Sequence, residues 1–323
     1  MLLAQLGTPD APTPAALRRY LREFLGDPRV VEANPVLWWF VLRLFVLPRR
    51  PRRSAALYQR IWTPEGSPLL IISRAQARGL EAELNRQEPG RFKVALGMRY
   101  GNPSIAAAVQ ELIAWGADRL LLFPMYPQYA AATTASTYDE VFRQLSALRF
   151  VPTLRVVPPY YTHESYLDAL ADSVRESMTR VPQPPEKIVI SFHGIPQRYA
   201  DNGDPYPAHC EATARALAAR MGWSDEAYLL SYQSRTGSEP WLRPYTDEMF
   251  AELGHAGVRH ILAICPGFVA DCLETIDEIG SVGLEQFQAA GGETLHLVEG
   301  LNTRPRWIEA MAAIALEQLQ GWT

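Results

Sequence analysis

Short runs of leucine and β-branched residues alternate along the chain with longer segments in which apolar residues recur every three to four positions. The short runs predict buried strands, and the longer segments predict amphipathic helices. Strands are expected within residues 1–7, 92–100, 118–127, 150–160, 187–194, 226–234, 259–268 and 293–301. Helices are expected at 103–115, 166–179 and 209–221. This alternation is typical of an α/β fold with parallel sheets.

The eight predicted strands form two groups of four, separated near the proline-marked segment 156–161. A chain of 323 residues also exceeds the size that one hydrophobic core usually supports. We therefore expect two α/β domains, residues 1–155 and 156–323. In open sheets of this class, ligands bind beyond the carboxyl ends of the strands, so the residues that follow each strand are the first candidates for a site. Neither GxGxxG nor GxxxxGK[ST] follows a strand, which argues against a nucleotide ligand.

Composition excludes several classes of function. A net charge of −4 and a pI near 5.9 give no reason to expect a nucleic-acid partner. The three cysteines, Cys210, Cys265 and Cys272, have no CxxC spacing, so one chain can build neither a disulfide framework nor a four-cysteine metal site. We expect a cytoplasmic protein, because the cysteines are few and the first ten residues carry no secretory signal.

The most apolar stretch, PVLWWFVLRLFVLP at 35–48, is too short to span a bilayer and contains Arg43. It is apolar on every side of a helix and precedes the basic run RRPRR. We call residues 35–53 the lip segment. Its apolar side chains can touch an anionic membrane surface or admit a large flat apolar ligand; the alternative is a buried helical hairpin whose basic end is only solvated. Its aromatic residues are Trp38, Trp39, Phe40 and Phe45.

His193 lies near the end of the predicted strand 187–194 and is followed by Gly194 and, after Ile195, by Pro196. A lone histidine in this place is most often a capping or core residue. Its position at the carboxyl end of a strand favours a second interpretation, because a neutral imidazole can take up a proton or coordinate a divalent metal.

An acidic cluster occupies the segment PGFVADCLETIDEI at 266–279. If the segment is helical from about Val269, Asp271, Glu274 and Glu278 share one face, with Asp277 close by. Acidic residues in a first turn often only complement the helix dipole, but this accounts for the first two and not for those deeper in the helix. Carboxylates beside a histidine suit a divalent metal such as iron, although no HExxH pattern indicates a tightly held one.

Six motifs together resemble the ferrochelatases, the enzymes that insert ferrous iron into a porphyrin at the end of haem synthesis. The resemblance extends over essentially the whole chain, in order. The motifs are QLGTPD (5–10), MRYGNPS (98–104), YPQYAAATTAST (126–137), SFHGIPQRY (191–199), YQSRTGSEPWLRPYTDE (232–248) and PGFVADCLETIDEI (266–279).

The resemblance implies a chelatase-like fold of two Rossmann-like domains, each a four-stranded parallel sheet flanked by helices, with a porphyrin cleft between them. The last helix, 303–321, would pack back on the first domain. His193 and Glu274 match the family's principal catalytic pair and would also contact the metal. The acidic path for metal or protons would comprise Asp271, Asp277 and Glu278. The porphyrin-binding positions would be Leu6, Arg99, Tyr100, Tyr126, Trp241 and Phe268.

The implied reaction needs a proton acceptor, because a free-base porphyrin must lose two inner N–H protons as the metal enters. By analogy with the family, apolar walls would hold the ring in a bent shape that exposes its nitrogen lone pairs. His193 would accept the pyrrole protons, and the acidic path would guide Fe²⁺ inward or carry protons outward. The resemblance leaves the division of metal and proton roles between His193 and Glu274 open.

Two departures from the family pattern affect the site. Many relatives have a second histidine where this chain has Cys272, which puts the proton-relay role of that position in doubt. Relatives that use coproporphyrin tend to have tyrosine where Leu6 stands, so Leu6 favours protoporphyrin IX. Some relatives hold a [2Fe–2S] cluster on four cysteines, and three cysteines argue against one here.

The expected partners are protoporphyrin IX and Fe²⁺, which is a substrate, with no permanently bound cofactor and no nucleic acid. Peripheral contact with the inner membrane through the lip segment is a separate expectation, and a monomer is favoured over an oligomer. Two competing functions remain: a porphyrin or haem carrier, which would not need the acidic path, and a chelatase for cobalt and a different tetrapyrrole.

Overall fold

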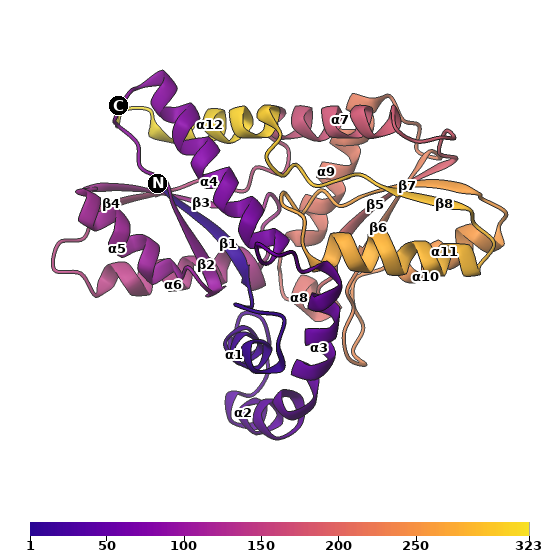
Figure 1. Cartoon of the computed structure of the whole chain (residues 1–323), viewed down its shortest axis with the longest axis horizontal. Helices are drawn as coiled ribbons and strands as arrows, with labels where there is room; N and C mark the ends of the chain where they lie inside the picture. Colours follow the sequence, from indigo (N-terminus) through magenta and orange to yellow (C-terminus); the bar gives the residue numbers. More distant parts are fainter. Residues whose placement is uncertain (323) are drawn as a thin grey trace. The chain divides into compact units, whose positions relative to one another are not determined.

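The structure, a computed structural model, describes residues 1–322 and divides the chain into two compact units. Unit 1 comprises residues 1–159 together with the C-terminal segment that begins at Thr303, and unit 2 comprises residues 160–302. All eight predicted strands are present, four in each unit (Figure 1).

The first unit ends after Pro159, a few residues beyond the predicted boundary at residue 155. The reason lies in the backbone that follows the fourth strand. The N–H of Val157 donates to the carbonyl oxygen of Leu122 over 2.9 Å, so this stretch continues the first sheet instead of leaving it.

The sheet of unit 1 consists of four parallel strands in the order β2-β1-β3-β4. The strands are β1 (Leu2–Thr8), β2 (Ala95–Gly101), β3 (Arg119–Pro124) and β4 (Thr153–Val156). In the central strand β1, Leu2 lies opposite both Ala95 and Leu122. Leu2, Leu3 and Ala4 are all buried, as expected for a parallel strand covered on both faces.

Helices cover both faces of this sheet (Figure 1). They are α4 (Pro68–Gln87) and α12 (Pro305–Leu319), which pack against each other, and α5 (Ile105–Trp115), the π-helical turn η2 (Ala131–Ala135) and α6 (Ser136–Ser146). Side chains of α5 and α6 pack with Leu2 and Ala4 of β1 in one apolar cluster. The C-terminal helix α12 is tied to the sheet edge, because Arg155 Nη1 donates to the carbonyl oxygen of Gln318 over 2.7 Å.

The lip segment belongs to unit 1 and lies with α1 beyond the carboxyl end of β1 (Figure 1). Its helical elements follow α1 (Pro14–Phe24) and are α2 (Pro35–Val41), the π-helical turn η1 (Leu42–Val46) and α3 (Leu47–Ile61). No residue of α2 is buried. Leu42 and Leu47 are the buried residues of the apolar run in the cluster formed with α1, and Trp38 and Val46 pack against it while partly exposed. Most of the run is exposed, so its interpretation as a buried hairpin is wrong.

Unit 2 repeats the strand order of unit 1, with parallel strands in the order β6-β5-β7-β8. The strands are β5 (Lys187–His193), β6 (Tyr228–Gln233), β7 (His260–Ile264) and β8 (Thr294–Leu297). The helices are α7 (Glu164–Met178), α8 (Gln197–Asp201), α9 (Tyr206–Met221), α10 (Thr246–His255), the π-helix η3 (Glu274–Gly283) and α11 (Leu284–Ala289). One of the two inner strands of this sheet, β5, ends at His193.

The length and apolarity that a membrane-crossing helix needs are not combined in any helix of residues 1–322.

Candidate functional site

His193 is the last residue of β5, whose preceding residues Val189, Ile190 and Phe192 are fully buried. Its ring is half-buried, and Nδ1 lies 2.6 Å from the carbonyl oxygen of Gly194. A carbonyl oxygen only accepts hydrogen bonds, so Nδ1 carries a proton in this contact. The second nitrogen, Nε2, then has a lone pair when the ring is neutral, which makes His193 a proton acceptor or metal ligand rather than a saturated core residue.

Two aromatic side chains flank this imidazole. The ring centroid of His193 lies 6.4 Å from that of Trp241 and 6.5 Å from that of Phe268. A Cβ atom on Gly194 would lie 3.2 Å from the Trp241 ring and 3.1 Å from the carbonyl oxygen of Gln233, so a side chain at residue 194 would push into this wall. The indole Nε1 of Trp241 is buried and has no acceptor within residues 1–322, which leaves one N–H available to a ligand.

Gln233 joins this strand end to the acidic segment. It ends β6 and lies opposite His193 in the register of the two strands. Its buried amide Nε2 donates to the carbonyl oxygen of Glu274 over 2.8 Å and to Oε2 of Glu278 over 3.4 Å, while Oε1 accepts from Ser191 Oγ over 2.9 Å. The start of η3 is therefore held beside the ends of β5 and β6.

Hydrogen bonds and nearby charges act on the carboxylate of Glu278. Its Oε1 accepts from the backbone N–H of Ser234 over 2.7 Å, and its Oε2 accepts from the Ser234 hydroxyl. Burial raises the pKa of Glu278, bonding to Ser234 and the positive charge of His193 lower it, and the negative charge of Glu274 raises it; the net pKa is raised. The predicted pair His193 and Glu274 thus lie within electrostatic range of the same half-buried carboxylate.

The expectation of a helix from about Val269 that places Asp271 on one face with Glu274 and Glu278 is wrong. Regular helix begins at Leu273, and the following turns are π-helical, a form that is frequent at functional sites. Residues before it are irregular because Asp271 bonds to the chain around it instead of extending the helix.

Asp271 is buried and its carboxylate is fully engaged. Oδ1 accepts from Thr275 Oγ1 over 2.8 Å and from the N–H of Gly300 over 3.1 Å, and Oδ2 accepts from Asn302 Nδ2 over 2.6 Å. This residue ties the loop at 300–302 to the start of η3, and its place in an acidic path stays a prediction. Asp277 is buried within η3.

No cluster of three or more histidine, cysteine or acidic side chains within residues 1–322 has a geometry that would hold a metal ion. The two cysteines near the site are buried. Burial raises the pKa of the Cys272 thiol well above its usual value, and the charge of Glu274 adds to this. Burial likewise raises the pKa of Cys265. Cys272 is therefore a neutral thiol and does not replace a histidine as proton acceptor.

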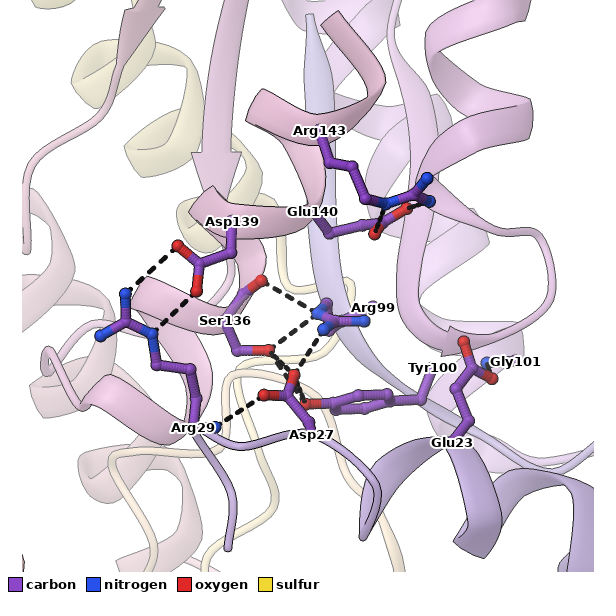
Figure 2. Close-up of polar contacts among 10 residues, drawn as sticks. All are labelled: Glu23, Asp27, Arg29, Arg99, Tyr100, Gly101, Ser136, Asp139, Glu140 and Arg143. Atoms are coloured by element: carbon purple, nitrogen blue, oxygen red, sulfur yellow. Dashed lines mark hydrogen bonds and ion pairs between the residues drawn. The ribbon is translucent and has the colours of Figure 1, made fainter. Parts of the chain in front are cut away.

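The predicted porphyrin-binding residues of unit 1 have unequal access to a ligand. Tyr100 is fully buried, and its hydroxyl donates to Oδ2 of Asp27 over 2.8 Å, so the prediction that it lines a binding surface is wrong for this conformation (Figure 2). Arg99 is held by the same carboxylate and by Ser136. Leu6 and Tyr126 are half-buried and remain predicted ligand contacts.

The lip segment exposes most of its aromatic residues. Trp39, Phe40 and Phe45 are 48%, 50% and 60% exposed. Trp38 differs from them, because its indole Nε1 donates to the carbonyl oxygen of Leu25 over 2.6 Å and its ring packs with the cluster at the base of the segment. Trp38 thus anchors the lip segment, and its contact with a membrane or porphyrin stays a prediction.

Sequence reasoning missed Gln233, Ser234 and Asp27. The first two lie at the end of the predicted strand 226–234, the position at which ligand-binding residues are expected, but an amide and a hydroxyl gave no chemical reason to select them. Asp27 had no sequence signal, because its side-chain partners Arg99 and Ser136 lie 72 and 109 residues away in the chain.

Comparison with known proteins gives the following similarities. A family model described as Ferrochelatase matches residues 1–319. A ferrochelatase of Thioalkalivibrio sulfidiphilus is 49% identical over 322 residues, which cover 100% of this chain and 87% of that protein. Ferrochelatase 1 of Shewanella oneidensis is 46% identical over 322 residues, and a ferrochelatase of Escherichia coli is 46% identical over 312 residues; each match covers 96% of the relative and at least 97% of this chain.

Solved structures support the fold alone. The chelatase SirB from Bacillus subtilis, solved with Fe³⁺, matches with a TM-score of 0.57 at 16% identity, covering 78% of this chain and 92% of that one. CbiX, described as the terminal enzyme of sirohaem biosynthesis in denitrifying bacteria, matches with a TM-score of 0.51 at 13% identity, covering 78% and 95%. The two four-stranded parallel sheets thus form a chelatase-like fold, as predicted.

Proposed function

This chain belongs to the ferrochelatase family, whose members insert iron into porphyrins, and from this premise we propose that its substrates are Fe²⁺ and protoporphyrin IX and its product haem b. The observation that carries the proposal is the half-buried imidazole of His193, with Nδ1 bonded and Nε2 available, beside two carboxylates. This is the donor set that a reaction consuming a dication and releasing two protons requires.

In the proposed mechanism, His193 Nε2 accepts a pyrrole proton as Fe²⁺ enters the ring. The porphyrin loses two N–H protons and gains one iron ion, so its charge is unchanged and two protons must leave. A positioned general base contributes about 10²- to 10⁴-fold to the rate of such a step. The Gly194 carbonyl keeps the ring in the tautomer that the transfer requires, because it accepts from Nδ1.

Glu274 and Glu278 interact with Fe²⁺ and with the released protons in this mechanism. Their negative charges attract Fe²⁺, and the raised pKa of Glu278 suits it to receive a proton from His193 and release it again. Gln233 holds both residues in register with the imidazole through its amide. Asp271 holds the loop at 300–302 through its carboxylate oxygens.

The porphyrin is proposed to bind in a bent form against the rings of Trp241 and Phe268. Both rings flank His193 at about equal distances. Binding energy from the remote faces of the macrocycle would offset the cost of bending, which exposes the nitrogen lone pairs to the metal. Leu6, an apolar residue at the family's LGTP motif, supports protoporphyrin IX rather than coproporphyrin as the substrate.

The test of this function is anaerobic turnover. Purified protein, Fe²⁺ and protoporphyrin IX should give haem b, and coproporphyrin should give a lower kcat/KM. His193→Ala should lower kcat by about 10²- to 10⁴-fold. His260→Ala is the matched control. His260 is the first residue of β7 and forms a hydrogen bond with Thr294, so it lies at the opposite end of the sheet from the carboxyl ends of the strands, where His193 lies.

Three results would contradict the proposal. Porphyrin binding without any metal insertion would identify a carrier, and a preference for cobalt and another tetrapyrrole would identify a sibling chelatase. A His193→Ala variant that keeps the wild-type kcat would exclude the imidazole as proton acceptor.

We also propose that the protein is cytoplasmic and touches the membrane peripherally through the lip segment. Exposed Trp39, Phe40 and Phe45 form the apolar face, and the basic run at 49–53 supplies attraction to anionic lipid. No resident cofactor and no iron–sulfur cluster enter the proposal, and the protein is proposed to act as a monomer.

Vesicle sedimentation tests the membrane proposal with a closely matched control. Trp39→Ser/Phe40→Ser should weaken binding to phosphatidylglycerol vesicles by about tenfold or more. Trp115 and Phe142 have the same exposed fractions as these residues, 49% and 50%, and lie on α5 and α6. Trp115→Ser/Phe142→Ser should leave binding unchanged; equal loss in both variants would show that exposed apolar area, not the lip segment, binds the vesicles.

A further inference from the structure

The loop between α1 and α2 contains a buried carboxylate that no part of the proposed chemistry uses. Asp27 has a side chain only 4% exposed. Its Oδ2 accepts from Tyr100 OH over 2.8 Å and from Ser136 Oγ over 2.6 Å, and it pairs with Arg99 Nη2 (Figure 2). Its Oδ1 accepts from the N–H of Arg29 over 2.7 Å. Both oxygens are therefore occupied, by partners from three different segments of unit 1.

These partners lie at fixed points of the unit. Arg99 and Tyr100 stand at the end of β2, and Ser136 begins α6. Arg99 is further held by Ser136, whose carbonyl oxygen and hydroxyl accept from Nε over 2.9 and 2.7 Å. The carboxylate of Asp27 thus connects a loop to the rigid end of the sheet.

The same loop is the base of the lip segment. The carbonyl oxygens of Leu25 and Asp27 accept from Trp38 Nε1 and from the N–H groups of Val30 and Val31. The helix that follows, α2, buries none of its residues, and its contact with the cluster formed with α1 is made by the half-buried Trp38. Its position therefore depends on Trp38, on what holds the loop before it, and on the apolar residues Leu42 and Leu47 after it.

We propose that Asp27 is a positioning residue: its carboxylate fixes the lip segment and the Arg99 side chain to the carboxyl end of β2, and thereby sets the affinity of unit 1 for the porphyrin. The proposal rests on the proposed function only in naming porphyrin as the ligand. Asp27 itself touches no substrate in this account. Its effect is transmitted through Arg99 and through the base of the lip segment.

The experiment compares Asp27→Asn with Asp139→Asn. Asn keeps the size of the side chain but removes the charge that pairs with Arg99. Asp139 is the matched control, because it forms an ion pair with Arg29 of the same loop over 2.8 Å, but with both side chains about half exposed. Hydrogen exchange of amides in residues 26–46 and the Kd for metal-free protoporphyrin are measured for each protein, in the absence of Fe²⁺.

Asp27→Asn should speed exchange in residues 26–46 by about tenfold or more and raise the porphyrin Kd by about tenfold, with exchange in β5 and β6 unchanged. Asp139→Asn should change both quantities less than twofold. Tyr100→Phe removes one hydrogen-bond donor to Asp27 and leaves the ion pair with Arg99. Its exchange rates and porphyrin Kd should therefore lie between those of the two Asp→Asn variants. This variant replaces Asp27→Asn in the test if Asp27→Asn does not fold.

Unchanged exchange in Asp27→Asn, or an effect of Asp139→Asn equal to that of Asp27→Asn, would overturn the proposal. Faster exchange with an unchanged porphyrin Kd would also overturn it, since Asp27 would then be only structural. Neither hydrogen exchange nor the porphyrin Kd involves metal insertion. A protein that binds porphyrin without turnover would refute the proposed function, but it would still allow these two measurements to decide the role of Asp27.

Discussion

Each unit places a carboxylate at the end of the same edge strand of the same topology, but the two carboxylates have different surroundings. Asp27 is buried, and Glu278 is half-buried. In unit 1, Asp27 contacts the end of the edge strand β2, and in unit 2, Glu278 contacts the end of the edge strand β6. Asp27 pairs directly with the guanidinium of Arg99. Glu278 receives only neutral donors, from Gln233 and Ser234.

The consequence is a difference in protonation. Burial raises the pKa of Asp27, but hydrogen bonds from Ser136, the Arg29 N–H and Tyr100, with the charge of Arg99, outweigh it and the pKa is lowered. The pKa of Glu278 is raised, mainly by burial. In unit 1, Asp27 is therefore a constant negative charge that stabilises the local structure. In unit 2, Glu278 is a carboxylate that can change its protonation, as a reaction that releases protons requires.

Removing the fixed charge should give the largest change in stability. Asp27→Ala leaves the Arg99 guanidinium, 15% exposed, without its partner, and we expect the urea transition of unit 1 to lose about 3–5 kcal/mol. Hydrogen exchange of β2 amides in urea reports this unit separately. Asp139→Ala, which breaks an exposed pair, should lose about 1 kcal/mol or less. Similar losses in the two variants would remove the contrast between buried and exposed pairing.

The pH dependence of stability should have opposite signs at the two carboxylates. Asp27, with a lowered folded pKa, contributes stability that is present above its unfolded pKa of about 3.9 and is lost as pH falls through the folded pKa. Glu278, with a raised folded pKa, binds its proton more tightly when folded, so its contribution declines as pH rises from about 4.3 through the folded pKa.

Urea titrations at a series of pH values measure both effects. Asp27→Asn should reduce the loss of unfolding free energy as pH falls in the acid range. Glu278→Gln should reduce the loss of unfolding free energy as pH rises above about 4.3. Identical pH profiles for wild type and Glu278→Gln would mean that Glu278 is not perturbed in solution.

Loss of the anchoring indole should have an intermediate effect. Trp38→Phe keeps an aromatic ring but removes the hydrogen bond to the Leu25 carbonyl, and we expect a loss of about 1 kcal/mol in the stability of unit 1. Trp39→Phe is the control, since Trp39 lies on the exposed side of the lip segment, and it should have no effect. Equal effects would show that Trp38 is not an anchor.

The smallest effect on stability is expected at Glu278. Glu278→Gln retains an acceptor for the Ser234 N–H and removes a charge that burial disfavours, so the free energy of unfolding at neutral pH should change by about 1 kcal/mol or less. A loss as large as that of Asp27→Ala would show that the two carboxylates are equivalent and would undo the comparison.

Periodicity and strand-end positions predicted a large part of this structure. All eight strands and the helices at 103–115, 166–179 and 209–221 were predicted, because apolar runs and three-to-four spacing report burial directly. The strand-end rule also selected His193. The start of the acidic helix was not predictable, since it depends on bonds from Asp271 to Gly300 and Asn302, which are remote in the chain.

The polar contacts of the buried carboxylate in unit 1 were equally unpredictable from the sequence. Asp27 contacts Arg99, which lies 72 residues away in the chain, and the MRYGNPS motif that contains Tyr100 does not indicate burial. A pattern of apolar residues predicts which residues are covered, but not which donor a buried carboxylate finds.

Chemical rescue of His193→Ala tests the central claim most directly. Added imidazole should restore the rate of iron insertion at saturating porphyrin by about tenfold or more, and the rescue should grow with the basicity of substituted imidazoles of similar size. A variant that still binds porphyrin but gains no activity, or gains the same activity from every imidazole whatever its basicity, would show that the side chain at the end of β5 does not take the proton.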